Sequence, residues 1–202
     1  MSFTKELEDA FNASFPVHVL EAMVKCIFNA YKVAYDECKQ RFTPEEAHDL
    51  LPFYRWVQLR MELRGLGGRF QQLQTTAEPN GSSSHIVIDS YQFMLTVSSV
   101  DRPGGFPRPA NYRYDYANES QLSLLEPLQN NSKVYAVLIH GVDKKDRSRP
   151  AFSEIVFPEK GFESYIHKID LFSKFDGLFK TVDKAPELKE VSPRVIKKAQ
   201  GE

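Results

Sequence analysis

The chain has few cysteines, no excess of charge of either sign and no long apolar run. Its 202 residues include only two cysteines, Cys26 and Cys38, which lie twelve positions apart in one stretch of helical pattern. Twelve residues of helix extend about 18 Å, which is too far for a disulfide bond. We therefore expect two reduced thiols and no disulfide framework.

The charge balance argues against a dedicated nucleic-acid coat. Lys and Arg total 26 and Asp and Glu total 27, so the formal net charge is −1, whereas such proteins usually carry a basic excess. No uncharged stretch is long enough to span a bilayer, and the first residues lack the apolar core of a signal peptide. The sequence thus predicts a cytoplasmic protein that does not associate with a membrane.

Local motifs for catalysis, metals and cofactors are also missing. The cysteines and histidines do not have zinc-type spacing, so no metal is expected. Neither the dinucleotide pattern nor the phosphate-loop pattern is present, so we expect no cofactor. Signatures of serine hydrolases and zinc proteases are absent as well, which favours a binding protein over an enzyme without closing the question.

The first third of the chain has helical periodicity. With 42% hydrophobic residues, including 15 Phe and 9 Tyr, the chain can bury a core without metal or disulfide support. Apolar residues recur at helical spacing over 4–15 and 17–41. Thr43-Pro44-Glu45-Glu46 predicts a capping box at the start of a third helix over 44–64.

Two further signals concern this third helix. Pro52 should break or kink it, because proline removes a backbone donor and clashes with the preceding turn. Gly65 and the pair Gly67-Gly68 should end it in a left-handed cap.

The remainder has the two-residue period of strands, interrupted by turns. Residues 75–84 are rich in Pro, Asn, Gly and Ser, which predicts a loop and hinge. Residues 162–180 fit either helix or strand, and we favour helix. The other elements are a strand over 91–99 with a hairpin partner at 85–88, a helix over 110–126, and strands over 133–140 and 151–157 joined by a charged loop.

These elements predict an α+β fold in which a helical N-terminal sub-domain precedes a mainly antiparallel β-sheet covered by one or two helices. The expected division is a helical sub-domain over 1–74, a sheet with its covering helices over 85–180, and an extended charged tail over 181–202.

One candidate site is the helix over 53–64, where cations alternate with aromatic rings. Arginine side chains beside a stacking ring suit phosphate, carboxylate or an unstacked base. The alternative is a surface helix whose arginine side chains cover apolar neighbours and form ion pairs with nearby Glu or Asp. We prefer this alternative, because rows of arginines are common on the surfaces of ordinary helices. The residues concerned are Arg55, Trp56, Arg60, Arg64 and Arg69.

A second group of candidates lies in the β region and comprises His85, Asp89, Arg113 and His140. Histidines at strand ends can act as acid–base groups when two of them meet across a sheet, which makes His85, Asp89 and His140 the candidates for catalysis. Nothing in the sequence places them together. Histidines bonded to backbone carbonyls are the preferred interpretation.

Two functions follow as hypotheses. The first is a non-enzymatic interaction or regulatory protein that docks a protein partner or associates with itself. The alternative is a nucleic-acid-binding or RNA-processing protein that uses the arginine-bearing helix and the strand-end histidines. A continuous positive groove beside that helix favours the alternative, whereas neutralisation by Glu and Asp favours the first.

Overall fold

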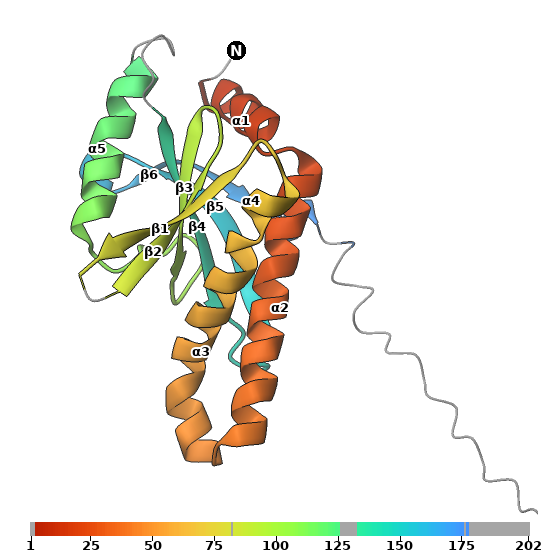
Figure 1. Ribbon diagram of the computed structural model, residues 1–202. Coiled ribbons are helices and arrows are strands. Elements are labelled where there is room, and N and C mark those ends of the chain that lie inside the picture. Colours follow the sequence, from red (N-terminus) through yellow and green to blue (C-terminus); the bar gives the residue numbers. More distant parts are fainter. Residues whose placement is uncertain (1–2, 82, 126–132, 176, 178–202) are drawn as a thin grey trace, which may run out of the picture.

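The computed structural model describes residues 3–81, 83–125, 133–175 and 177, and it has the expected α+β class (Figure 1). Helices precede a six-stranded sheet, and another helix lies between its third and fourth strands. The elements are α1 (Phe3–Ser14), α2 (Val17–Arg41), α3 (Pro44–Arg64), α4 (Leu66–Arg69), β1 (Gln74–Asn80), β2 (Ser83–Asp89), β3 (Phe93–Ser99), α5 (Asn111–Leu125), β4 (Val134–Val142), β5 (Pro150–Pro158), the short 3-10 turn η1 (Lys160–Phe162), β6 (Tyr165–Asp170) and α6 (Leu171–Lys174).

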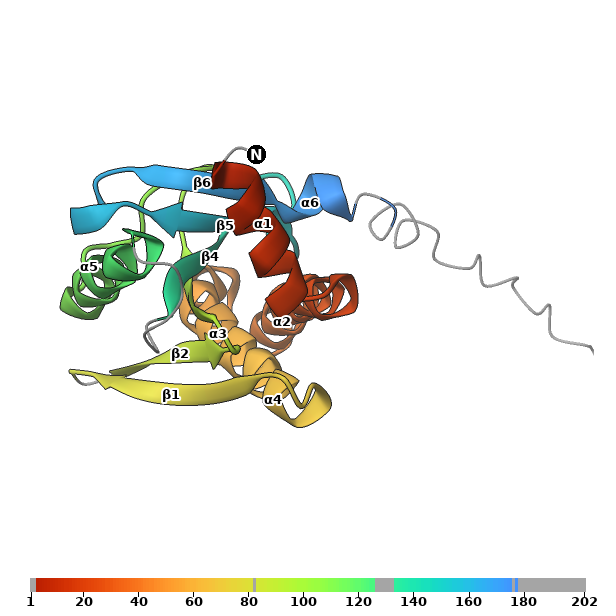
Figure 2. The ribbon, with the colours of Figure 1, turned by 90° about the horizontal axis from the view of Figure 1, so that it is seen from above.

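The strands follow one another across the sheet in chain order, from β1 to β6. All neighbouring pairs are antiparallel except β3 and β4, which are parallel. A parallel pair requires a crossover, and α5 provides it. Figure 2 shows α5 on one side of the sheet and α1, α2 and α3 on the other.

Both faces of the sheet are buried, and β4 shows this most clearly. Leu138 packs into a large cluster with α1, α2 and α3, whereas Ile139 packs into a smaller cluster with Ala117 of α5. Every residue from Val134 to Gly141 is buried. β4 is thus a central strand, with β3 and β5 on its two sides. The helix α5 covers one face of the sheet at β4, and the N-terminal helices cover the other.

The capping box at the start of α3 is confirmed. The Thr43 hydroxyl accepts a hydrogen bond from the Glu46 amide, and the Glu46 carboxylate accepts one from the Thr43 amide at 2.9 Å. Two of the amides that a helix start leaves without partners are satisfied in this way.

The expected break at Pro52 is wrong, because α3 continues through it. Proline cannot donate to the carbonyl four residues earlier, which belongs to His48. Arg147, from the loop between β4 and β5, donates to that carbonyl at 3.4 Å. A side chain 99 positions away along the chain therefore replaces the missing helical hydrogen bond.

The expected left-handed cap is also wrong. Gly65 has a right-handed conformation with φ of −65°, and both Gly67 and Gly68 lie within α4. A Cβ atom on Gly67 would lie 2.7 Å from the Thr75 hydroxyl, so this glycine allows β1 to approach closely. The Thr75 hydroxyl in turn donates to the Arg64 carbonyl at 2.9 Å.

Two segments differ from the prediction in the sheet. The expected loop over 75–84 contains β1, which pairs with β2 along seven residue pairs from Gln74↔Asp89 to Asn80↔Ser83. Pro79 is tolerated because β1 is an edge strand. The expected helix over 162–180 contains β6, which pairs with β5 from Glu154↔Asp170 onward, and only four residues of α6 follow.

The other predicted elements are confirmed, including α2, α5, the β2–β3 hairpin and the β4–β5 hairpin. The division at residue 74 stays a prediction, although the large buried cluster contains residues from both sides of it. The predicted tail over 181–202 lies outside the described residues. Over the described ranges, no helix combines the length and the apolar character that crossing a membrane requires.

Candidate functional site

A cavity opens where β2 separates from β3. The two strands are paired at only three positions, from Val87↔Thr96 to Asp89↔Met94, and the preceding residues of β2 pair with β1 alone. The cavity has a volume of about 260 Å³, and α2, α3 and α5 contribute to its walls together with four strands. It is therefore a small, partly open site between the two helical layers.

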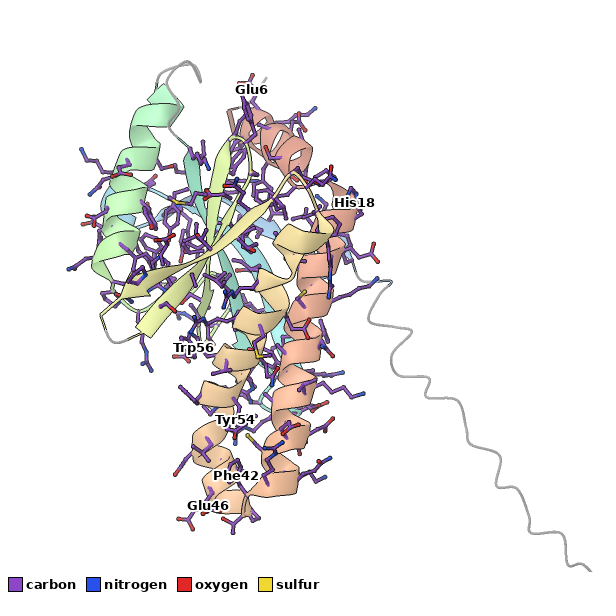
Figure 3. The ribbon with its side chains drawn as sticks, in the orientation of Figure 1. Glu6, His18, Phe42, Glu46, Tyr54 and Trp56 are labelled. Atoms are coloured by element: carbon purple, nitrogen blue, oxygen red, sulfur yellow. The ribbon has the colours of Figure 1, made fainter. Side chains whose placement is uncertain are left out.

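Three arginines line this cavity, and each guanidinium lies over an aromatic ring. Arg55 lies 4.9 Å from the centre of Tyr31, Arg60 lies 4.4 Å from Trp56, and Arg113 lies 4.9 Å from Tyr112. Figure 3 shows Trp56 on the side of α3 that is turned toward β1 and β2. Such stacking uses the face of a guanidinium and leaves its edge, where the N–H groups bind phosphate or carboxylate in pairs.

Two serines hold two of these arginines in place. Arg60 donates through Nη2 to the Ser84 hydroxyl, and Arg113 donates through Nη2 to the Ser98 hydroxyl at 3.2 Å. Arg55 donates instead to the Arg147 carbonyl at 3.1 Å. The Nε atoms of all three arginines are buried and have no hydrogen-bond partner in the described part of the chain.

The cavity carries positive charge without a counter-charge. Over the described ranges, no Asp or Glu lines it, and Arg55, Arg60 and Arg113 form no ion pair. Burial lowers the pKa of Arg55, which shows the cost of holding that charge away from water. An anion beside Arg55 would offset part of this cost, because opposite charges stabilise each other where water is excluded.

The two histidines named as candidates both line the cavity, but their surroundings differ. The Nδ1 atom of His140 lies 2.8 Å from the Tyr31 hydroxyl. Burial, followed by the charge of Arg55, lowers the pKa of His140 to about 4, so this imidazole is neutral at pH 7. Burial raises the pKa of Tyr31 to about 12, so the Tyr31 hydroxyl keeps its proton and can donate it to His140.

His85 stacks on Tyr112, with ring centres 3.7 Å apart and planes 9° apart. Its side chain is 8% exposed, yet neither ring nitrogen has a hydrogen-bond partner among the described residues. Burial, and then the charge of Arg113, lower the pKa of His85. The expectation that both histidines would be bonded to backbone carbonyls is therefore wrong.

The remaining predicted site residues lie elsewhere. Arg64 and Arg69 are exposed and do not line the cavity. Asp89 forms an ion pair with Lys133 at 2.9 Å, on the wall of a different hollow. The arginines of α3 thus do not act as a single stripe, because Arg55 and Arg60 line the cavity and Arg64 does not.

Sequence reasoning selected Arg55, Trp56, Arg60, Arg113 and both histidines separately, but it did not bring them together. It missed the two serines and the rings of Tyr31 and Tyr112. Ser84 and Ser98 carry no local signal, since serine is common in polar strands and turns. Their partnership with arginines depends on the separation of β2 from β3.

Comparison of the chain with protein families, with curated proteins and with solved structures found no match. The chemistry of the cavity therefore has to be interpreted from its own residues. Three guanidinium groups, two serine hydroxyls and two neutral imidazoles can bind and orient an anion and can exchange hydrogen bonds with a neutral polar group.

Proposed function

We propose that the protein binds a small anionic ligand in the cavity between β2 and β3. The observation that carries the proposal is that Arg55, Arg60 and Arg113 line one cavity with buried, unpaired Nε atoms and with no carboxylate among the described lining residues. A phosphate carries about −1.5 to −2 charges near pH 7 and matches three cations better than a single carboxylate does. The proposal concerns binding in the cytoplasm and requires no catalytic step.

The size of the cavity favours a small phosphate-bearing ligand over a long nucleic acid. A cavity of about 260 Å³ suits a small molecule or one terminal group of a larger one, and small-molecule sites commonly have volumes of about 300 Å³ or more. The positive charge is local, since Arg64 and Arg69 lie outside the site. We therefore propose a free small ligand and not the backbone of a long nucleic acid.

Isothermal titration calorimetry with inorganic phosphate, in a buffer that contains no other multivalent anion, tests this function. Arg60→Gln and Arg113→Gln should each weaken binding by about 10-fold to 100-fold, because each removes charged hydrogen bonds to the anion. Arg64→Gln is the matched control, since it removes the same charge from the exposed part of α3. Equal binding by all four proteins, or no anion binding by the unsubstituted protein, would refute the proposal.

A second function, contact with a protein partner, is favoured by one observation on α3. Phe53 is 59% exposed and its ring lies 5.7 Å from that of Trp56, which is 39% exposed. Neighbouring exposed aromatic rings are typical of contact surfaces. If they join two copies of this chain, sedimentation velocity over a wide range of concentrations should show dimers that Phe53→Ser abolishes. A monomer at every concentration would argue against self-association.

A further inference from the structure

His85 is a buried imidazole that faces the cavity without a hydrogen-bond partner. More than nine-tenths of its surface is covered, and Tyr112 holds the ring by stacking. Both nitrogens are buried and unpaired in the described part of the chain. Buried polar atoms in folded proteins nearly always have partners, so an unpaired one in a binding cavity indicates a partner that the ligand supplies.

The charge state of His85 determines what that partner can be. Burial and the charge of Arg113 hold its pKa below the usual value of 6.5, so the ring is neutral at pH 7. A neutral imidazole has one N–H donor and one acceptor nitrogen. The charged and titratable groups around it are Arg113, Tyr112 and Tyr116 of α5, Glu78 of β1 and Arg60 of α3.

An acceptor nitrogen cannot bind an anion, because both carry lone pairs. It can accept a hydrogen bond from a hydroxyl group. The serines of the site suit the same type of ligand, since Ser84 and Ser98 accept from arginines and still have a hydroxyl proton to donate. The aromatic rings of the cavity offer little surface on which a nucleobase could stack. Guanidinium groups lie over Tyr31 and Trp56, and His85 covers a face of Tyr112.

We infer that the ligand is a hydroxylated phosphate ester, such as a sugar phosphate. Its phosphate would bind Arg60 and Arg113, and a hydroxyl group a few bonds away would donate to His85. This inference rests on the proposed anion site. It adds that the ligand also carries an uncharged hydroxyl-bearing part. A free sugar phosphate and a ribonucleotide share this chemistry, and the covered aromatic faces favour the free sugar phosphate.

Calorimetry with two matched pairs of ligands tests the inference. Glycerol 3-phosphate and n-propyl phosphate have the same carbon chain and differ in hydroxyl groups, while ribose 5-phosphate and AMP differ in the nucleobase. The unsubstituted protein should bind glycerol 3-phosphate about 5-fold to 10-fold more tightly than n-propyl phosphate, which corresponds to one hydrogen bond. AMP should bind no more tightly than ribose 5-phosphate; tighter binding of AMP would identify a nucleotide site.

His85→Phe keeps a ring against Tyr112 and removes both nitrogens. The variant should bind the two three-carbon esters equally, and its thermal melting should show that it is folded. If it still prefers glycerol 3-phosphate, or if the unsubstituted protein shows no preference, the inference fails. The anion site survives that failure provided that Arg60→Gln still weakens binding of both esters by about 10-fold to 100-fold, whereas no binding of any ester refutes both proposals.

The pH dependence of the preference gives an independent readout. Both ligands are alkyl phosphate monoesters, so changes in phosphate charge with pH largely cancel in the ratio of their affinities. The ratio therefore reports mainly on the protein. The pKa of His85 is lowered from its usual value, so its protonation requires more acidic solution. Protonation removes the acceptor, and the ratio should fall toward one as the pH is lowered through that pKa. In His85→Phe the ratio should stay constant with pH. A constant ratio in the unsubstituted protein across the same range would overturn the role of His85.

Discussion

Replacing His85 by phenylalanine should raise the stability of the ligand-free protein, although the residue is almost completely buried. Its two ring nitrogens have no partners among the described residues, and a buried polar atom without a partner costs about 1–3 kcal/mol. Phenylalanine keeps the stacking on Tyr112 and removes both polar atoms. Allowing for some loss from its different shape, we expect the free energy of unfolding to rise by about 1–2 kcal/mol.

His140→Phe is the matched comparison and should have the opposite effect. His140 is also buried on the cavity wall, but its Nδ1 atom is paired with the Tyr31 hydroxyl at 2.8 Å. The substitution removes this partner of the buried Tyr31 hydroxyl. We expect a loss of about 1–3 kcal/mol.

Urea unfolding followed by circular dichroism at neutral pH measures both changes. The buffer should contain no phosphate, because a bound anion would add stability of its own. For a chain of this size, 1 kcal/mol corresponds to about 2–4 °C in melting temperature, so thermal scans give a second measurement. If His85→Phe loses as much stability as His140→Phe, then His85 has a structural partner and the reasoning is wrong.

Three other predictions concern the scaffold. Thr43→Ala removes the capping box of α3 and should lower the free energy of unfolding by about 0.5–2 kcal/mol without changing anion affinity. Leu138→Ala or Ile139→Ala leaves a cavity in the central strand and should cost about 2–5 kcal/mol, seen as a lower urea midpoint. The free energy of unfolding should fall as the pH is lowered from 6.5 toward 4, because His140 takes up a proton in the unfolded chain at a higher pH than in the folded chain. The loss should approach ~3 kcal/mol, and His140→Phe should remove this component from the pH profile.

Each of the three scaffold predictions can be contradicted by a specific result. A Thr43→Ala variant as stable as the parent would show that the cap contributes nothing. Parent-like melting of both strand variants would place β4 at an exposed surface. A pH profile that is the same with and without His140 would mean that its imidazole titrates alike in the folded and unfolded chains.

The elements that the sequence predicted correctly are those with local signals. Thr43 and Glu46 define a helix start within four residues, and the apolar run of β4 identifies a buried strand wherever its neighbours lie. The errors arose where distant residues decide the outcome. The side chain of Arg147 donates to the His48 carbonyl, which Pro52 leaves without a helical partner. Residues 165–170, whose pattern fits both helix and strand, form a strand that pairs with β5.

The candidate site follows the same rule. The arginines and histidines of the cavity could be selected from the sequence because of their chemistry. Their position around one cavity depends on where β2 separates from β3 and on which face of the sheet α5 covers. Neither is encoded in a short stretch of sequence. The pairing of Tyr31 with His140 joins residues 109 positions apart, which periodicity cannot reveal.

This separation of the site residues along the chain has a consequence for folding. The cavity walls come from elements between α2 and β4, more than 100 residues apart at Tyr31 and His140, so the site requires long-range contacts to form. Folding places the like charges of Arg55, Arg60 and Arg113 around one cavity, where they repel one another. If the proposed anion binds there, it offsets this repulsion and stabilises the folded chain, so the population of folded protein would rise with ligand concentration.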